Sequence, residues 1–176
     1  GLGVLYETLA HEGYPGHLYF FNYVKQQGWH PINFFVSNIG FEEGWAEYAA
    51  RLSLDSWGLD PDMMEVIFLD QEFSYLLMGL SDIGINYGGW TVDDVYDLWE
   101  TYFYLDSAED VRDVYDACMA EPGTILSYSI GYYQICDLEE EVKEMLGESF
   151  DHNEFVTELL SVGGASFDIT RSYIME

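Results

Sequence analysis

The chain has 176 residues, enough for one domain with a hydrophobic core or for part of a larger one. Hydrophobic residues make up 49% and aromatic residues 18%, which excludes an intrinsically disordered tail. With 33 Asp and Glu residues against 5 Lys and Arg residues, the formal net charge is −28. This charge excludes nucleic acid and disfavours anionic membrane surfaces as partners, because both attract cationic side chains.

Predicted helices follow one another along the chain, each bounded by recognisable capping or helix-breaking residues. The first covers residues 2–13, is interrupted at Pro15-Gly16 and resumes over residues 17–27. A second covers residues 40–57 and ends at Gly58, and Asp60-Pro61 opens a third that runs to residue 84. Further helices are expected after Thr91 and Ser107, over residues 123–146 and 151–162, and in a short stretch through residue 171.

Strand-like alternation is confined to short, isolated segments such as residues 33–39, so the sequence predicts an all-α fold. We interpret residues 1–176 either as a single helical domain or as the C-terminal catalytic portion of a longer protein. The chain begins without Met and has no run of eighteen apolar residues, so we expect an excised segment without a membrane-spanning helix. Its cellular compartment is not readable.

The two cysteines lack the spacing of a metal site. If the turn at residues 121–123 joins antiparallel helices, Cys118 lies within a turn of it, whereas Cys136 lies roughly 20 Å along the second helix. A disulfide needs Cα atoms about 4.4–6.8 Å apart. We therefore predict two core thiols that are not bridged.

One segment carries catalytic chemistry: H-E-G-Y-P-G-H over residues 11–17. In the zinc motif H-E-x-x-H, the two histidines lie about 400° apart around a helix, so both point to one face. Here His17 lies six residues after His11, about 240° away on an unbroken helix. However, Pro15 cannot donate a hydrogen bond to the carbonyl of His11, and Gly16 can adopt a left-handed conformation. A break at this point would return His17 to the face of His11.

A third ligand is expected from the segment F-E-E-G-W-A-E-Y over residues 41–48. Catalytic zinc sites of this kind take a carboxylate from a following helix and leave the fourth position to water. We choose Glu43, because Gly44 beside it allows a close approach of two backbones. Glu47 lies one turn further on and is expected to orient a ligand histidine. The simpler alternative is that these carboxylates form a solvated helix face.

These residues resemble the bacterial family catalogued as domain of unknown function 885, a predicted group of zincin-like metallopeptidases. The resemblance rests on H-E-x-x-P-G-H over residues 11–17 and on E-G-W-A-x-Y over residues 43–48. Weaker similarities follow in the same order over residues 82–91, 122–131 and 146–155. Full-length members are two to three times longer, which implies that this chain packs on an N-terminal domain that is missing here.

The resemblance implies a zinc-dependent hydrolase of peptide or amide bonds with a peptide substrate. Zn²⁺ would be bound by His11, His17 and Glu43, and Glu12 would act as the general base. Tyr128 is the candidate donor to the oxyanion, since the resemblance carries a tyrosine there, although a core aromatic is the simpler interpretation. Tyr132 and Tyr133 are weaker rivals for that role.

Other residues are interpreted as lying outside the site or as departures from the family pattern. His30 is expected in a turn and His152 at an exposed helix start, and neither is expected to bind metal. Four positions differ from residues that many members carry: Asn86, Ala117, Thr124 and Val156. Two alternatives therefore stay open: a catalytically silent relative that binds metal or peptide, and a helical interaction domain whose histidines are structural.

Overall fold

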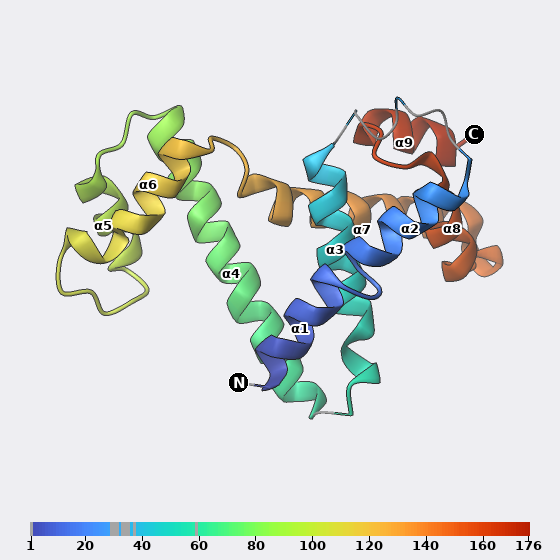
Figure 1. Ribbon diagram of the computed structural model, residues 1–176, viewed down its shortest axis with the longest axis horizontal. Helices are drawn as coiled ribbons and strands as arrows, with labels where there is room; N and C mark the ends of the chain where they lie inside the picture. Colours follow the sequence, from blue (N-terminus) through green and yellow to red (C-terminus); the bar gives the residue numbers. More distant parts are fainter. Residues whose placement is uncertain (1, 29–31, 33–35, 37, 59) are drawn as a thin grey trace.

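The computed structural model describes residues 2–28, 32, 36, 38–58 and 60–176 (Figure 1). Within these residues every regular element is a helix, which confirms the all-α fold. The α-helices are α1 (Leu2–Glu12), α2 (His17–Gln26), α3 (Ile39–Ser53), α4 (Pro61–Asn86), α5 (Val92–Trp99), α6 (Arg112–Ala120), α7 (Leu126–Leu146), α8 (His152–Val162) and α9 (Phe167–Ile174). Short 3₁₀ helices accompany them, among them η2 (Leu54–Ser56), η3 (Ala108–Val111) and η4 (Gly147–Ser149). None of these helices is long and apolar enough to cross a membrane.

The helix starts follow the predicted caps. Asp60 accepts a hydrogen bond from the backbone N–H of Met63 at 3.1 Å, with proline at the first helical position of α4. Thr91 forms a reciprocal capping box at the start of α5, and Asp151 caps α8. Each cap satisfies backbone N–H groups that have no partner within the helix. The capping box at Ser107 leads first into η3 and only then into α6.

Some helix ends differ from the prediction. Helix α7 begins three residues later than expected, because the chain first turns at Gly123, where φ is +81°. Helix α3 ends at Ser53 and is followed by η2, which ends at Ser56, two residues before the predicted stop at Gly58. Helix α9 continues three residues beyond Arg171. These are the positions where local turns with i→i+3 hydrogen bonds compete with regular helix.

Two apolar clusters lie toward opposite ends of the molecule (Figure 1). The larger joins α2, α3, α7 and α8 and includes the fully buried Phe41, Ile135 and Leu159. The smaller joins α4, α5 and α6 around Val95. The long helix α4 runs diagonally from the N-terminal helix α1 to the smaller cluster. Cys118 and Cys136 are free and pack on different clusters, as predicted.

Helices α3 and α7 touch through their backbones. A Cβ atom on Gly131 of α7 would lie 2.9 Å from the Cα of Gly44 and closer still to the carbonyl oxygen of Gly40. A Cβ on Gly44 would lie 2.7 Å from the Cα of Gly131. Only glycine fits at either position, so this contact fixes the depth at which α3 presents Glu43. The predicted role of Gly44 is therefore confirmed.

Helix α4 carries an exposed apolar stripe. Val66, Leu69, Phe73, Leu76, Leu80 and Ile83 are between 37% and 65% exposed, although all are large and apolar. Their separations along the chain alternate between three and four residues, which is the spacing of a coiled-coil seam. A continuous apolar stripe of this length on a protein surface is typical of an interaction site.

Candidate metal centre

The break between α1 and α2 brings the two histidines of the motif together. Helix α1 ends at Glu12, directly after His11, and α2 begins at His17. In the turn between them, the N–H of Gly16 donates to the carbonyl oxygen of Ala10 at 2.8 Å, while Pro15 has no N–H to donate. The predicted interruption of the helix is thus confirmed, and a motif two residues too long for one helix face closes into a single site.

Gly16 is required here for a reason other than the one predicted. Its φ is −73°, so the expected left-handed conformation is wrong. A Cβ at Gly16 would lie 2.6 Å from the carbonyl oxygen of Ala10 and would overlap that of His11. Glycine is needed because the turn presses against the last turn of α1.

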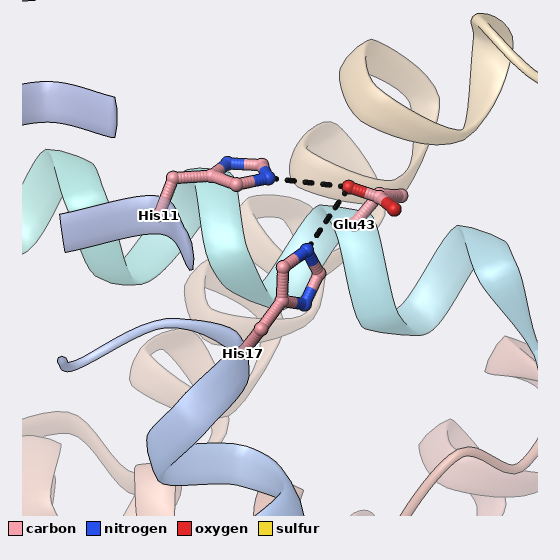
Figure 2. A group of neighbouring side chains, drawn as sticks. All are labelled: His11, His17 and Glu43. Carbon is pink, nitrogen blue, oxygen red and sulfur yellow. Dashed lines mark ion pairs between the residues drawn. The ribbon is translucent and has the colours of Figure 1, made fainter. Parts of the chain in front are cut away.

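Three side chains from three helices converge on one point (Figure 2). The Nε2 atoms of His11 and His17 each lie 3.3 Å from Oε2 of Glu43. The two imidazole rings are nearly perpendicular, with centroids 4.8 Å apart. Glu43 Oε2 and His17 Nδ1 are buried and make no hydrogen bond with a described residue. The three residues together offer ligand atoms within 4.8 Å of one another, a set that could hold a metal ion.

Two further buried carboxylates, those of Glu7 and Glu47, lie near His11. Oε1 of Glu47 lies 3.1 Å from His11 Nδ1, and Glu7 completes a second group of possible ligand atoms with them. Glu7 in turn accepts a hydrogen bond from Gln71 at 2.9 Å. Glu47 therefore occupies the place predicted for a carboxylate that orients a ligand histidine, because its ion pair with Nδ1 of His11 leaves Nε2 facing Glu43.

The imidazoles and carboxylates of the cluster shift one another's pKa values in opposite directions. Burial by itself would lower the pKa of His11, but the carboxylates of Glu43 and Glu47 outweigh it and raise the pKa to about 10. Burial would raise the pKa of Glu43, whereas the imidazoles of His11 and His17 lower it to about 2. In the metal-free site, a protonated His11 therefore forms a buried ion pair with the ionised Glu43, and a metal ion would take over the positive charge of that proton.

Glu12 and Tyr128 lie beside this cluster. Glu12 is exposed, and it lines a cavity together with His11 and Tyr128. The ring of Tyr128 stacks on His11 with centroids 5.9 Å apart. Burial, followed by the negative charge of Glu43, raises the pKa of Tyr128 to about 12. Tyr128 therefore lies at the site, whereas Tyr132 packs against Phe68 in the core.

The remaining candidates lie elsewhere. Tyr133 bonds Glu72 of α4. His152 begins α8 and is only partly exposed, contrary to the prediction of an exposed residue, because its Nδ1 lies 2.8 Å from Oε1 of Glu139. It belongs to neither group of possible metal ligands in the described part of the chain. His30 lies outside the described residues.

Sequence reasoning missed the part of the site that α4 provides. The ring of Tyr75 packs against that of Tyr128 at an angle, with centroids 5.0 Å apart, and its hydroxyl accepts a hydrogen bond from Gln71. Gln71 also donates to Glu7, which lies 64 positions earlier in the sequence. No local pattern reveals such a contact. Glu7 itself could have been found, because it lies four residues before His11 and hence on the same face of α1.

The fold and the site together define a class of protein: an all-α protein with a His-His-Glu cluster at the break between two helices. The chain belongs to the bacterial family described as "Bacterial protein of unknown function (DUF885)", whose profile matches residues 4–174. A comparison with curated proteins found no match.

Two solved structures share the fold, and both are described as candidate lipoproteins. The first, of unknown function, comes from Shewanella oneidensis; it has a TM-score of 0.81 and 23% identity, and the match covers 98% of this chain and 32% of that one. The second comes from Colwellia psychrerythraea, with a TM-score of 0.79 and 23% identity over 96% of this chain and 29% of that one. This chain therefore spans about a third of the length of these proteins. At such identity the similarity shows the fold alone.

Proposed function

We propose that this chain is the catalytic part of a zinc-dependent hydrolase of peptide or amide bonds, with His11, His17 and Glu43 as the zinc ligands. The observation that carries the proposal is the spacing of the ligand atoms. Ligands about 2.0–2.1 Å from a tetrahedral zinc ion are about 3.3 Å apart. Both Nε2 atoms lie 3.3 Å from Oε2 of Glu43, so two edges of such a tetrahedron are already present.

The donor set also suits zinc. Two imidazoles and one carboxylate, with the fourth position left to water, form a common catalytic zinc site. The buried Oε2 of Glu43 has no hydrogen bond in the described chain beyond its ion pairs with the two imidazoles, so its negative charge would balance a metal ion held among the three side chains. When bound, zinc acts as a Lewis acid that acidifies a water molecule and polarises a substrate carbonyl.

The residues around the centre then have separate roles. Glu12, exposed at the edge of the cavity, accepts a proton from the attacking water and returns it to the leaving amine. The hydroxyl of Tyr128 donates a hydrogen bond to the developing oxyanion. Glu47 holds His11 through Nδ1 and so orients its Nε2. The proposed substrate is a peptide, which would bind at the cavity lined by Glu12 and Tyr128.

The exposed stripe on α4 supports a proposal about what this chain packs against. We infer that it packs on a further part of the same protein, through a helix that fits the stripe between Val66 and Ile83. The separations of three and four residues favour a helix as the partner. The net charge of −28 disfavours a second copy of the chain. The similar structures, three times longer than this chain, have residues enough to supply such a helix.

The test of the proposed function replaces the base without touching the ligands. Glu12→Gln keeps the size of the side chain and removes its ability to accept the proton, a contribution of about 10²–10⁴ in rate. We expect the variant of the complete protein to retain zinc and fold and to lose peptide hydrolysis at least about a hundredfold. Glu148→Gln, which changes an exposed carboxylate on η4, is the matched control and should leave turnover unchanged.

Each outcome decides between the candidate roles. Unchanged turnover in Glu12→Gln would remove Glu12 from the mechanism. Zinc without turnover in the unmodified complete protein would favour a catalytically silent relative. If the unmodified complete protein has neither zinc nor turnover, the remaining interpretation is a helical interaction domain whose histidines are structural.

A further inference from the structure

We propose that the cavity beside the candidate metal centre binds a positively charged group of the peptide substrate, either its N-terminal ammonium or a Lys or Arg side chain. The inference rests on the proposed function, because it names the substrate class of that same site.

The cavity is a separate feature of the fold with its own walls. It lies between α1, α4, α6 and the start of α7 and has a volume of about 350 Å³. This volume is near the lower end of the range for small-molecule pockets, about 300–1,000 Å³, and suits one side chain or one chain end. Because His11, Glu12 and Tyr128 also line it, a group bound there lies next to the proposed catalytic residues.

Carboxylates from α1, from α4 and from the turn after α6 line the cavity. Glu7 from α1 and Asp82 from α4 are each only 3% exposed and form buried parts of the wall. Glu12 and Glu121 are exposed and line its outer part. Among the described residues that line the cavity there is no Lys or Arg. A cleft lined by carboxylates in low-dielectric surroundings concentrates cations and repels anions.

No described Lys or Arg neutralises this charge, and the cationic His11 in the wall is already paired with Glu43 and Glu47. Within the described chain, Asp82 accepts hydrogen bonds from uncharged groups, namely the side-chain amide of Asn86 at 3.1 Å and the N–H of Gly123 at 2.8 Å. Glu7 likewise accepts from the amide of Gln71. A carboxyl group has more acceptor sites than these bonds use, so both side chains retain capacity for a further donor. Four of the five Lys and Arg residues pair with carboxylates elsewhere: Arg51, Arg112, Lys143 and Arg171.

The rest of the wall suits the body of a basic residue. Met78 and Ile125 offer apolar surface against which the methylene stem of Lys or Arg can pack. Tyr75 adds an aromatic ring that attracts cations over its face. A pocket with apolar sides and carboxylates in its walls selects a cationic side chain or chain end over a neutral one of the same size.

Binding and turnover are measured on the complete protein with a host peptide of five alanines. In the first series, each position in turn carries Lys or norleucine, which has the same carbon stem without the charge. In the second series, the N-terminus of the peptide is either free or acetylated. Affinity is measured on zinc-free protein whose helix content has been checked by circular dichroism, and kcat/KM on zinc-loaded protein. We expect loss of the recognised charge to weaken binding at least tenfold, and more at low salt. The Lys series and the acetylation series distinguish the two sources of charge.

Variants on α6 test the place of binding. Ala117 is exposed on the cavity wall, so Ala117→Lys puts a cation into the cavity and should weaken binding of the preferred peptide about tenfold. Ala117→Gln adds bulk without charge and should have a clearly smaller effect. Ala120→Lys adds the same charge at the exposed end of the same helix, outside the cavity, and should leave binding unchanged.

The results separate this inference from the proposed function. Turnover with no charge preference in either peptide series would overturn the inference and leave the hydrolase intact. Charge-selective binding without any turnover would support the cation pocket and count against catalysis. Equal effects of Ala117→Lys and Ala120→Lys would also overturn the inference, because the preference would then come from overall charge and not from the cavity.

Discussion

The backbone contact between α3 and α7 makes a quantitative prediction about Gly131→Ala. A new Cβ would lie 2.9 Å from the Cα of Gly44, whereas carbon atoms in contact are about 3.5–4.0 Å apart. The two helices would therefore have to separate by about 1 Å. Neither neighbour can rotate away, because both Gly44 and the carbonyl oxygen of Gly40 belong to the backbone.

Two opposing effects decide the size of the change. Alanine is a better helix former than glycine by about 1 kcal/mol, which favours the variant. Overpacking in a close contact costs about 1–3 kcal/mol, and we expect the upper end of that range where backbone meets backbone. The free energy of unfolding should therefore fall by about 2 kcal/mol, which lowers Tm by about 4–8 °C in a protein of this size.

The assay is thermal unfolding followed by circular dichroism, together with zinc affinity. Zinc affinity should fall as well, because Glu43 lies beside Gly44 and moves with α3. Gly40→Ala is the control, since its Cβ would meet Asn38 at 3.4 Å and Phe167 at 3.9 Å, and the same helix preference without a backbone clash should leave it as stable as wild type or up to about 1 kcal/mol more stable. A Gly131→Ala protein as stable as wild type would refute the reasoning about the helix contact.

Two other predictions concern the site. Tyr128→Phe should retain zinc and lower kcat by about 10²–10³, the usual effect of losing one oxyanion donor, whereas Tyr133→Phe should not lower kcat; equal rates in both variants would exclude Tyr128 from the mechanism. Zinc binding at pH 7 should release about one proton and strengthen as pH rises toward 10, because His11 with a pKa of about 10 is protonated in the metal-free protein and must lose its proton to bind metal. Calorimetry in two buffers of different ionisation enthalpy measures this release, and no buffer dependence would contradict it.

The sequence predicts the local features of this fold well. Asp60, Thr91 and Asp151 mark helix starts because their side chains satisfy nearby backbone N–H groups, an interaction confined to four consecutive residues. The break after Glu12 is equally local, since Pro15 cannot continue the helical hydrogen bonds. The convergence of His11 and His17 follows from that break.

The features that the sequence did not predict are tertiary. Tyr75 reaches the site from a helix that begins fifty residues after α1, and nothing in its neighbourhood distinguishes it from a core aromatic. The requirement for Gly16 depends on how closely the turn packs on α1 and not on its own backbone angles. The exposure of the apolar stripe on α4 depends on which face of that helix the neighbouring helices cover.

Zinc content of the purified protein tests the central claim most directly. Metal analysis at neutral pH, after dialysis against buffer without chelator, should find one zinc per chain in wild type and in His152→Ala. His11→Ala and His17→Ala should each lose most of it, because two remaining ligands do not make a closed site. Absence of zinc from wild type, or equal loss in all three variants, would contradict the assignment of His11, His17 and Glu43 as a metal centre.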